Sequence, residues 1–516
     1  MVYDLAVING QVVDGAGNPG YQANIYVEDG RISKICRTKL GAETVLDAKG
    51  LIVAPGFIDI HQHSDYTVFA NPSCDSYIHQ GVTTANVGNC GLSLAPLTDE
   101  HRDDIIKFNE AFTFGMTVPY DWTSFPEYLD KLDSISLGLN LWPQVGHCTL
   151  RAAVMGYQAR KSTKTELTAM KALLEDAMLS GAYAMSTGAY APAYWADTAE
   201  IIELAKIVVK HGGLYTTHLR RFGFDEAIQI GEHAAIPVEV AHYHGKGVKE
   251  ARARGLDITY NAYPYTAGSS FLGQILPFEL YEGGVDSMLE RIQNTGTRDT
   301  IRKNPRIRTL SVDTRQNWRR QLISFLPNAR SKQYEGRSIG EIATSEAIDP
   351  VDWVCDTLLD NDGVGMYIHL NGRNEAYVYH TLQDPNEHVM SDGWAFAPQG
   401  PLRVGKPHPR CYGTYPRILG WYVRECEVVS LQEAVRKMTS APAQKMGLWD
   451  RGLLRTGMWA DITVFNPNTI IDHATFDDPH RHPSGIEYVV INGQLVISHG
   501  AHTGILAGRV LRKTKT

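Results

Sequence analysis

Strand-like apolar segments alternate with helix-like segments through the middle of this 516-residue chain, and this alternation constrains the fold most strongly. Alternation of this kind is typical of a parallel sheet whose strands are joined by crossover helices. The helix-like segments carry apolar residues at helical spacing, as at Ile201, Leu204, Ala205 and Val208. We interpret such stripes as packing faces of helices and not as functional sites.

Eight strand candidates can be placed in this region, and each ends at or near a polar residue. They end near His61/His63, Cys90, His147, Ser186, His218, His242, Tyr263 and Asp392. Eight parallel strands joined by helices predict an α/β fold of the closed (β/α)8 or TIM barrel type, whose active sites lie at the carboxyl ends of the strands. A doubly wound open sheet is the alternative. It is less favoured because no Gly-x-Gly-x-x-Gly motif opens the first helix, where a dinucleotide would bind.

Both ends of the chain carry short strand-like segments with hairpin turn signals. Asn9-Gly10 occurs near the start and Asn492-Gly493 near the end. Asn-Gly favours the tight turns that join antiparallel strands. We therefore expect a small β-sandwich domain built from residues 1–55 plus 445–516, next to a barrel domain of residues 56–444.

Residues 278–363 interrupt the alternation between the seventh and eighth strands. This segment is rich in charged and aromatic residues, among them Trp318, Phe325, Tyr334 and Trp353. An insertion at the carboxyl ends of barrel strands lies at the mouth of the active site, so we predict a lid-like role. A surface subdomain without a catalytic role is the alternative.

The composition excludes several classes of partner. A formal net charge of −8 argues against a nucleic-acid-binding protein. The chain has no apolar run long enough to span a bilayer, and its first residues lack the pattern of a secretory signal. Seven cysteines in a chain of this length do not suggest a disulfide framework, so a cytoplasmic location is expected. A homo-oligomer is compatible with this composition.

Two histidines at the first strand end can bind one metal ion. His61 and His63 are separated by one residue, and residues two apart in an extended segment project from the same face. Imidazole is the commonest side-chain metal ligand. Other strand ends add further ligand types at Cys90, His218, His242 and Asp392. A thiolate among the ligands favours zinc over magnesium.

Each of these residues has an ordinary structural explanation when it is taken alone. A buried cysteine such as Cys90 is usually an inert small hydrophobe, and His218 and His242 could form hydrogen bonds in the core. Asp392 precedes a glycine, as a turn residue would. A metal site is favoured because six such residues coincide at the same end of one barrel. His147 is expected at most to support the ligands from outside.

The motifs together resemble those of the amidohydrolase superfamily, and specifically of its D-aminoacylase (N-acyl-D-amino-acid deacylase) family. The resemblance extends over nearly the whole chain and rests on residues 54–65, 88–91, 145–147, 186–188, 263–269, 391–393 and 407–410. It implies a β-sandwich plus a barrel, with one tightly bound zinc ion and a second, weaker metal site. The tight site would be formed by Cys90, His218 and His242, and the weaker one by His61, His63 and Asp392. In many relatives a carboxylated lysine bridges two metals, whereas here the cysteine takes that strand-end role.

This resemblance implies a zinc-dependent amide hydrolase that deacylates N-acyl-D-amino acids to a carboxylate and a free D-amino acid. Zinc lowers the pKa of a bound water to about 7, which makes hydroxide available, and it polarises the scissile carbonyl. A base must take the proton of this water and later deliver one to the leaving amine. Asp392 is the residue expected to do both.

The family's substrate-binding residues are matched only in part. Tyr263, Ser269 and Arg403 match the positions that bind the substrate carboxylate, but His244 stands where the family has a lysine. A neutral histidine offers less positive charge to a carboxylate. The neighbouring segment 271–276 is apolar, which predicts a pocket for a hydrophobic side chain or an aromatic acyl group.

Two other functions are compatible with the residues. A hydrolase of another amide, a carbamate or a cyclic amide, including xenobiotic amides, could use the same site, and His244 is the feature that favours it. A metal-free relative with a binding role is the third, and the intact set of ligands argues against it. A small-molecule amide substrate is common to both enzyme hypotheses. Metal analysis and a substrate panel distinguish the three.

Overall fold

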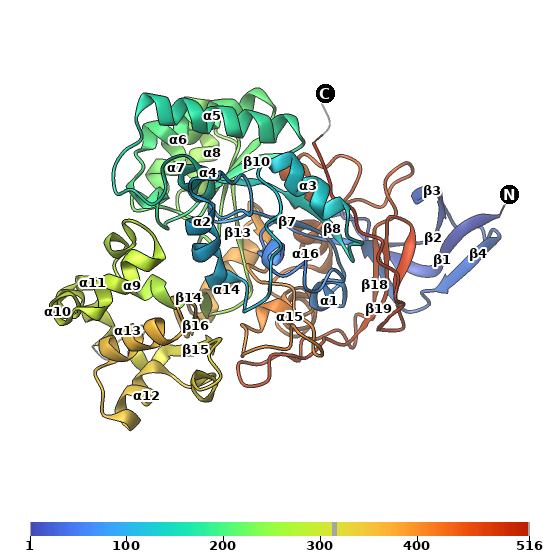
Figure 1. The fold of residues 1–516 in the computed structure, drawn as a ribbon. Helices are drawn as coiled ribbons and strands as arrows, with labels where there is room; N and C mark the ends of the chain where they lie inside the picture. Colours follow the sequence, from blue (N-terminus) through green and yellow to red (C-terminus); the bar gives the residue numbers. More distant parts are fainter. Residues whose placement is uncertain (1, 312–316, 514–516) are drawn as a thin grey trace.

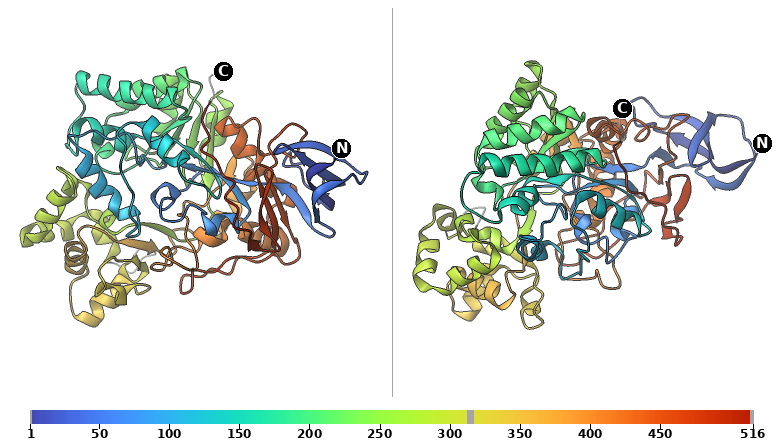
Figure 2. Two further views of the ribbon diagram at one scale, coloured as in Figure 1. Left: turned by 45° about the vertical axis from the view of Figure 1, so that its right-hand side comes forward. Right: turned by 45° about the horizontal axis from the view of Figure 1, so that its top comes forward.

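The computed structural model describes residues 2–311 and 317–513. Figure 1 shows a central region of parallel strands flanked by helices. Strands from the two chain ends lie on one side of this region, and a mostly helical unit lies on the other (Figures 1 and 2). The fold is therefore a mixed α/β fold with two peripheral parts.

Two sheets contain the parallel strands of the central region. Their strands are β6 (Phe57–Asp59), β7 (Val82–Val87), β8 (Asn140–Pro143), β9 (Val145–Gly146), β10 (Ala184–Thr187), β11 (Leu214–Thr217), β12 (Val238–Val240), β13 (Ile258–Ala262) and β17 (Glu387–Val389). One sheet has the order β6-β7-β8 and the other the order β9-β10-β11-β12-β13-β17. All neighbours within them are parallel. Strands therefore precede all eight predicted strand ends, the third as two pieces separated by Gln144.

The first and last parallel strands are connected by individual hydrogen bonds beyond their ends and not by regular β-strand pairing. In the described residues no strand pairing joins β6 to β17. The backbone N–H of Asp392 donates to the carbonyl of His61 at 2.9 Å, and that of His63 donates to the carbonyl of Gly393 at 2.8 Å. The buried Asp59 carboxylate also accepts from the backbone N–H groups of His61 and Ser391, at 3.2 Å each. These contacts hold the ends of the first and last strands together.

Amphipathic helices lie between the later of these strands along the chain. They are α4 (His147–Met155), α5 (Lys164–Leu179), α6 (Thr198–Lys210), α7 (Gly223–Ala234), α8 (Val248–Ala253) and α14 (Glu375–Gln383). In α6, Ile201, Leu204, Ala205 and Val208 are all buried, as the apolar stripe predicts. The Asp197 side chain caps the helix by accepting from the backbone N–H of Glu200 at 2.9 Å.

Further helices lie between the first three central strands and after the last one along the chain. They are α1 (Asp75–Ile78), α2 (Arg102–Asn109), α3 (Phe125–Asp133), α15 (Arg410–Arg417), α16 (Leu431–Met438) and α17 (Ser440–Met446). A π-helix continues α15 over Ile418–Glu425. None of the helices in the described part of the chain combines the length and the apolar character that a membrane crossing requires.

Strands from both chain ends share a single nine-stranded sheet. Its strands are β1 (Tyr3–Val12), β2 (Tyr21–Glu28), β3 (Arg31–Cys36), β4 (Ala42–Asp47), β5 (Ile52–Pro55), β18 (Ile462–Phe465), β19 (Ile486–Ile491), β20 (Gln494–Ser498) and β21 (Ala501–His502). The antiparallel pairing of β5 with β18 joins the two ends. Val7, Ile25, Val53 and Val464 belong to one buried apolar cluster, so side chains from both ends pack together.

The insertion between β13 and β17 is a helical unit on a small antiparallel sheet. Its elements are β14 (Gly268–Phe271), α9 (Val285–Gln293), α10 (Thr295–Lys303), α11 (Pro305–Leu310), β15 (Gln321–Phe325), α12 (Ile339–Glu346), α13 (Pro350–Asp360) and β16 (Met366–His369). Strand β16 lies between β14 and β15 in the sheet. The unit thus extends beyond the predicted range 278–363, because β14 and β16 pair at its base.

Candidate metal centre and active site

A cavity of about 360 Å³ opens at the carboxyl ends of the parallel strands. Five of the six predicted metal ligands line it: His63, Cys90, His218, His242 and Asp392. The sixth, His61, is buried and contacts both Cys90 and Asp392. The fold therefore brings residues from five different strand ends to one place, as expected for this end of parallel strands.

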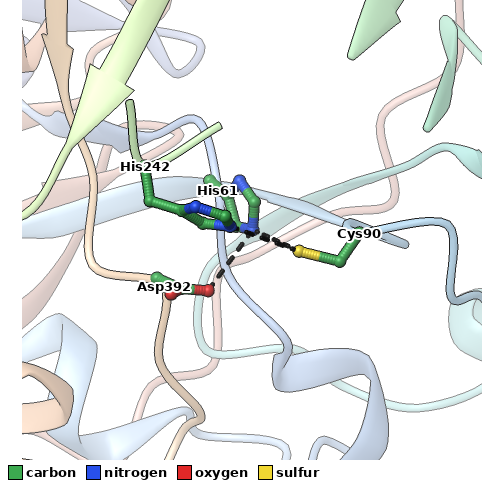
Figure 3. Close-up of side chains that lie close together, drawn as sticks. All are labelled: His61, Cys90, His242 and Asp392. Carbon is green, nitrogen blue, oxygen red and sulfur yellow. Dashed lines mark hydrogen bonds and ion pairs between the residues drawn. The ribbon is translucent and has the colours of Figure 1, made fainter. Parts of the chain in front are cut away.

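Four of these residues form a compact group, in which three are buried and His242 is half-buried. The Nε2 atom of His61 lies 3.3 Å from the Cys90 Sγ and 3.4 Å from the Asp392 Oδ1 (Figure 3). The Nε2 atom of His242 lies 3.8 Å from the same Sγ. Ligand atoms of His61, Cys90, His242 and Asp392 all lie within 4.8 Å of one another. One metal ion placed among them could contact a thiolate, two imidazoles and a carboxylate.

His63 and His218 lie at the edges of this group. The Nε2 atom of His63 is 3.3 Å from the Asp392 Oδ1. The ring of His218 packs edge-on against His242, with 4.4 Å between the ring centres. The compact group therefore includes residues from both of the metal sites that the sequence predicts. His61 and Asp392 come from the predicted weaker site, and Cys90 and His242 from the tighter one.

Three of the ligands have backbones in the left-handed region, where non-glycine residues are uncommon. The φ angles are 56° at Cys90, 38° at His242 and 54° at Asp392. Such backbones cost free energy and persist only where the surroundings hold them, often at functional sites. The backbone N–H of His242 donates to the Asn261 Oδ1 at 2.9 Å, and Gly188 lies directly against the carbonyl of Cys90. These contacts turn the ligands toward one another just after the strands end.

The Asp392 carboxylate is held in its charged form. Burial alone would raise its pKa, but the Arg410 guanidinium, 3.0 Å from Oδ2, lowers the pKa well below its usual range. Hydrogen bonds from His61 and His63 act in the same direction. Asp392 is therefore an anion at neutral pH, available to a metal ion or to a proton.

His218 and His242 are neutral, and the Cys90 thiolate needs a nearby cation. Burial lowers the pKa of His218 to about 4 and that of His242 well below 6.5, so both imidazoles keep a lone pair at neutral pH. Burial and the Asp392 charge raise the pKa of the Cys90 thiol well above its usual value. A bound divalent cation would reverse this effect and favour the thiolate. The donor set of sulfur, imidazole nitrogen and carboxylate fits zinc.

Two of the four predicted substrate-binding residues line the cavity. They are Tyr263 and Ser269, whose hydroxyl donates to the carbonyl of Tyr367 at 3.0 Å. Arg403 is exposed and does not line the cavity. His244 is also outside the cavity lining, and its Nδ1 accepts from the backbone N–H of Lys246. The structure thus does not bring Arg403 and His244 to the cavity, because the loops after β12 and β17 direct them elsewhere.

Arg373, which the sequence reasoning did not select, lies beside the metal ligands. One of its nitrogens, Nη2, donates to the carbonyl of His242 at 2.8 Å. The other, Nη1, is buried and has no hydrogen-bond partner among the described residues. The guanidinium stacks on the ring of Tyr263 at 4.4 Å. The sequence signal that could have identified Arg373 was its position shortly after a strand, but that strand, β16, was not predicted from the sequence.

Two further basic or polar residues of the predicted motifs have supporting positions. Arg410 belongs to the 407–410 motif and provides the charge against Asp392. His147 is fully buried, and its Nε2 lies 2.8 Å from the Glu200 carboxylate, which also pairs with Arg151. His147 therefore belongs to a buried ion-pair network at the start of α4, outside the cavity lining.

The remaining wall of the cavity combines apolar and polar side chains. Its apolar and aromatic members include Leu92, Phe112, Tyr190, Ile275, Leu310 and Trp394, and its polar members include Ser270, Gln274, Arg306, Thr309 and His369. Leu310 and the exposed Arg306 come from α11 of the insertion. The insertion therefore contributes part of the cavity wall, on the side away from the parallel strands.

Comparisons with known proteins agree with this arrangement. A family model described as "Amidohydrolase family" matches residues 44–213 and 385–497. The D-aminoacylase of Alcaligenes xylosoxydans xylosoxydans is 34% identical over 99% of this chain and 98% of that protein. A solved D-aminoacylase structure, concerned with that enzyme's binuclear metal centre, is 32% identical, with a TM-score of 0.81 over 99% of this chain and 100% of the other.

The structure of an N-acyl-D-glutamate deacylase from Bordetella bronchiseptica, in complex with zinc and a phosphonate inhibitor, is also similar. It is 28% identical, with a TM-score of 0.82 over 99% of this chain and all of the other. The family model matches segments on both sides of the insertion and includes residues 61, 63, 90 and 392. The chain therefore belongs to the amidohydrolase family, in its D-aminoacylase branch.

Proposed function

We propose that this protein is a metal-dependent deacylase of N-acyl-D-amino acids. The observation that supports this most directly is the compact group of His61, Cys90, His242 and Asp392 at the base of the cavity. A metal ion held by a thiolate and imidazoles beside an ionised carboxylate is suited to the hydrolysis of an amide. The similarity to D-aminoacylases and to an N-acyl-D-glutamate deacylase supports the substrate class.

The proposed metal is zinc, with one tightly held ion and a second, weaker position. Cys90, His218 and His242 would hold the tight ion, and His61, His63 and Asp392 the weaker one. The closeness of His61 to Cys90 supports adjoining positions. When bound, zinc lowers the pKa of water and polarises the scissile carbonyl.

Asp392 is the proposed general base and acid. Its carboxylate is ionised and lies at the cavity, so it can take the proton of the attacking water. It would then deliver a proton to the nitrogen of the leaving D-amino acid. Arg410 maintains the charge of Asp392 and would also hold its orientation.

Arg373 is the proposed partner of the substrate carboxylate, together with Tyr263 and Ser269. Its Nη1 has unused hydrogen-bonding capacity in a buried position beside the metal ligands. Arginine–carboxylate bonds are charge-assisted and orient the substrate as well as binding it. The apolar side chains of Ile275 and Leu310 in the cavity wall support a hydrophobic side chain or acyl group at the other end of the substrate.

The finer architecture is also part of this proposal. We infer that the eight parallel strands close into a (β/α)8 barrel, with a β-sandwich from residues 1–55 plus 445–516. The hydrogen bonds from Asp392 and His63 across the gap between the first and last strands support closure. Residues 278–363 would act as a lid, which the presence of Arg306 and Leu310 at the cavity supports.

A substrate panel tests the proposal. The zinc-loaded protein is assayed on the N-acetyl derivatives of D-Leu, D-Phe, D-Glu and L-Leu, and on a hydantoin and a carbamate. Highest kcat/KM on the D-Leu or D-Phe derivative is the expected result. Preference for the hydantoin or carbamate would instead support the alternative, a hydrolase of another amide or cyclic amide. Clear preference for D-Glu would contradict the hydrophobic pocket but not the deacylase activity.

A further inference from the structure

A second cluster of metal-binding side chains lies outside the catalytic cavity. Asp75 begins the short helix α1, His79 follows its last residue, and His482 belongs to the loop between β18 and β19. None of the three lines the cavity. The cluster thus joins the central region of the molecule to a loop from its C-terminal part.

The three side chains converge closely. The Nε2 atom of His482 lies 3.6 Å from one carboxylate oxygen of Asp75, and the Nδ1 of His79 lies 3.5 Å from the other. The rings of His79 and His482 stack with 3.8 Å between their centres. One ligand atom from each residue lies within 4.8 Å of the other two. The side chains are 11–25% exposed, so an ion could enter from solvent.

An ordinary ion pair explains this arrangement poorly. Separations of 3.5 and 3.6 Å are too long for good nitrogen–oxygen hydrogen bonds. Two imidazolium rings stacked this closely would repel each other, so at least one ring is neutral. The Nδ1 of His482 is buried and has no hydrogen-bond partner among the described residues.

The distances between these nitrogen and oxygen atoms do suit ligands that bind one common metal ion. A tetrahedral site with bonds of about 2.1 Å places its ligand atoms about 3.4 Å apart, close to the 3.6 Å between His482 and Asp75. The Nδ1 of His79 is 2.8 Å from the backbone carbonyl of Asp75, to which it can donate. Such a bond is typical of metal-binding histidines because it orients the ring, and Nε2 would then be the ligand atom of His79.

We propose that Asp75, His79 and His482 form a second metal site, separate from the catalytic centre, for a divalent transition ion such as zinc or copper. Two imidazoles and one carboxylate select this class of ion over magnesium or calcium. Water would complete the coordination. The ion would connect α1 to the loop between β18 and β19, so its expected effect is on stability and not on turnover.

Metal content tests the proposal. Full-length wild type and the variants His482→Gln, His79→Gln and His473→Gln are saturated with zinc, passed through a desalting column and measured by mass spectrometry. His473 is exposed, lies in the same loop and is outside the cluster, which makes His473→Gln the matched control. We expect wild type and His473→Gln to retain one more ion per chain than the two cluster variants, with kcat the same in all four. Equal zinc content in the four proteins would overturn the proposal.

Electron paramagnetic resonance of wild type provides a test that does not depend on the folding of a variant. Copper(II), in an amount below one ion per chain, is added to protein that carries no more zinc than its catalytic centre holds, so that the second site is open to copper. We expect coupling to nitrogen nuclei of two imidazoles, falling to one in His482→Gln and unchanged in His473→Gln. A spectrum without imidazole coupling in wild type would show that the cluster is only a stacked histidine pair beside a carboxylate.

Discussion

Asp392 lies between a buried arginine and two histidines, and this position determines its ionisation. Replacing it with asparagine removes the proposed proton acceptor with little change in volume. We expect Asp392→Asn to lower kcat by roughly 10²- to 10⁴-fold, the usual contribution of a general acid–base group. The exposed Asp477 provides a control, since Asp477→Asn should retain full activity. Zinc content is measured alongside kcat, because loss of the ion would be a different cause.

Arg373 and Arg403 are alternative candidates for binding the substrate carboxylate. The family pattern indicates Arg403, whereas the cavity lining indicates Arg373. We expect Arg373→Ala to raise KM by roughly 10- to 100-fold, the cost of one or two charge-assisted hydrogen bonds, with a smaller effect on kcat. A larger increase in KM for Arg403→Ala would reverse this assignment.

His369 provides a pH dependence of stability. Burial, with Arg373 and Arg410, lowers its pKa from 6.5 to about 4. Below pH 6.5 the unfolded chain therefore binds a proton that the folded protein does not, so stability is lost as pH falls from 6.5 to 4. The slope is at most about 1.4 kcal/mol per pH unit.

Denaturant unfolding at several pH values measures this contribution. Relative to wild type, His369→Gln should lose less stability between pH 6.5 and 4. The control His233→Gln removes an exposed histidine on α7 and should leave the pH dependence unchanged. Parallel curves for wild type and His369→Gln would contradict the prediction.

At the scale of elements, the turns that end the strands position the ligands. Gly188, just after β10, has no space for a side chain, since a Cβ there would lie 1.8 Å from the carbonyl oxygen of Cys90. We expect Gly188→Ala to destabilise the protein by about 3 kcal/mol, at the upper end of the usual cost of overpacking. It should also weaken zinc binding, because the Cys90 turn must move.

Thermal unfolding and zinc titration of the Gly188→Ala variant check this prediction. Gly41→Ala is the control, because a Cβ at Gly41 meets no atom of the described residues within 4 Å. The control should lie within about 0.5 kcal/mol of wild type, as surface substitutions usually do. Unchanged zinc affinity in Gly188→Ala would show that the Cys90 turn tolerates the shift.

The elements also show where a sequence pattern is informative. Apolar periodicity predicted α6, and short apolar runs that end at polar residues predicted the eight strand ends, because each of these patterns lies within a single segment. The same reasoning placed the start of the insertion at Phe278 and missed β14 and β16. Those strands pair with each other across about 100 residues, and such pairing leaves no local period.

At the scale of the whole molecule, metal binding couples the strand ends to one another. Removing the metal with a chelator should abolish activity and lower the melting temperature, since the ion binds only the folded protein. Zinc should restore both, and magnesium should restore neither. The experiment is repeated in His482→Gln so that the second proposed site does not contribute. Full activity in a protein that contains no metal would contradict a metal-dependent mechanism.

The sequence by itself determined the order of the central parallel strands and indicated a set of candidate ligands, since both depend on residue type and local spacing. It could not determine which side chains face the cavity. That choice depends on the left-handed backbones at Cys90, His242 and Asp392 and on loops that turn Arg403 outward. It also depends on the distant pairing that brings Arg373 beside His242. These features arise from contacts between segments far apart in the chain, which only the tertiary structure decides.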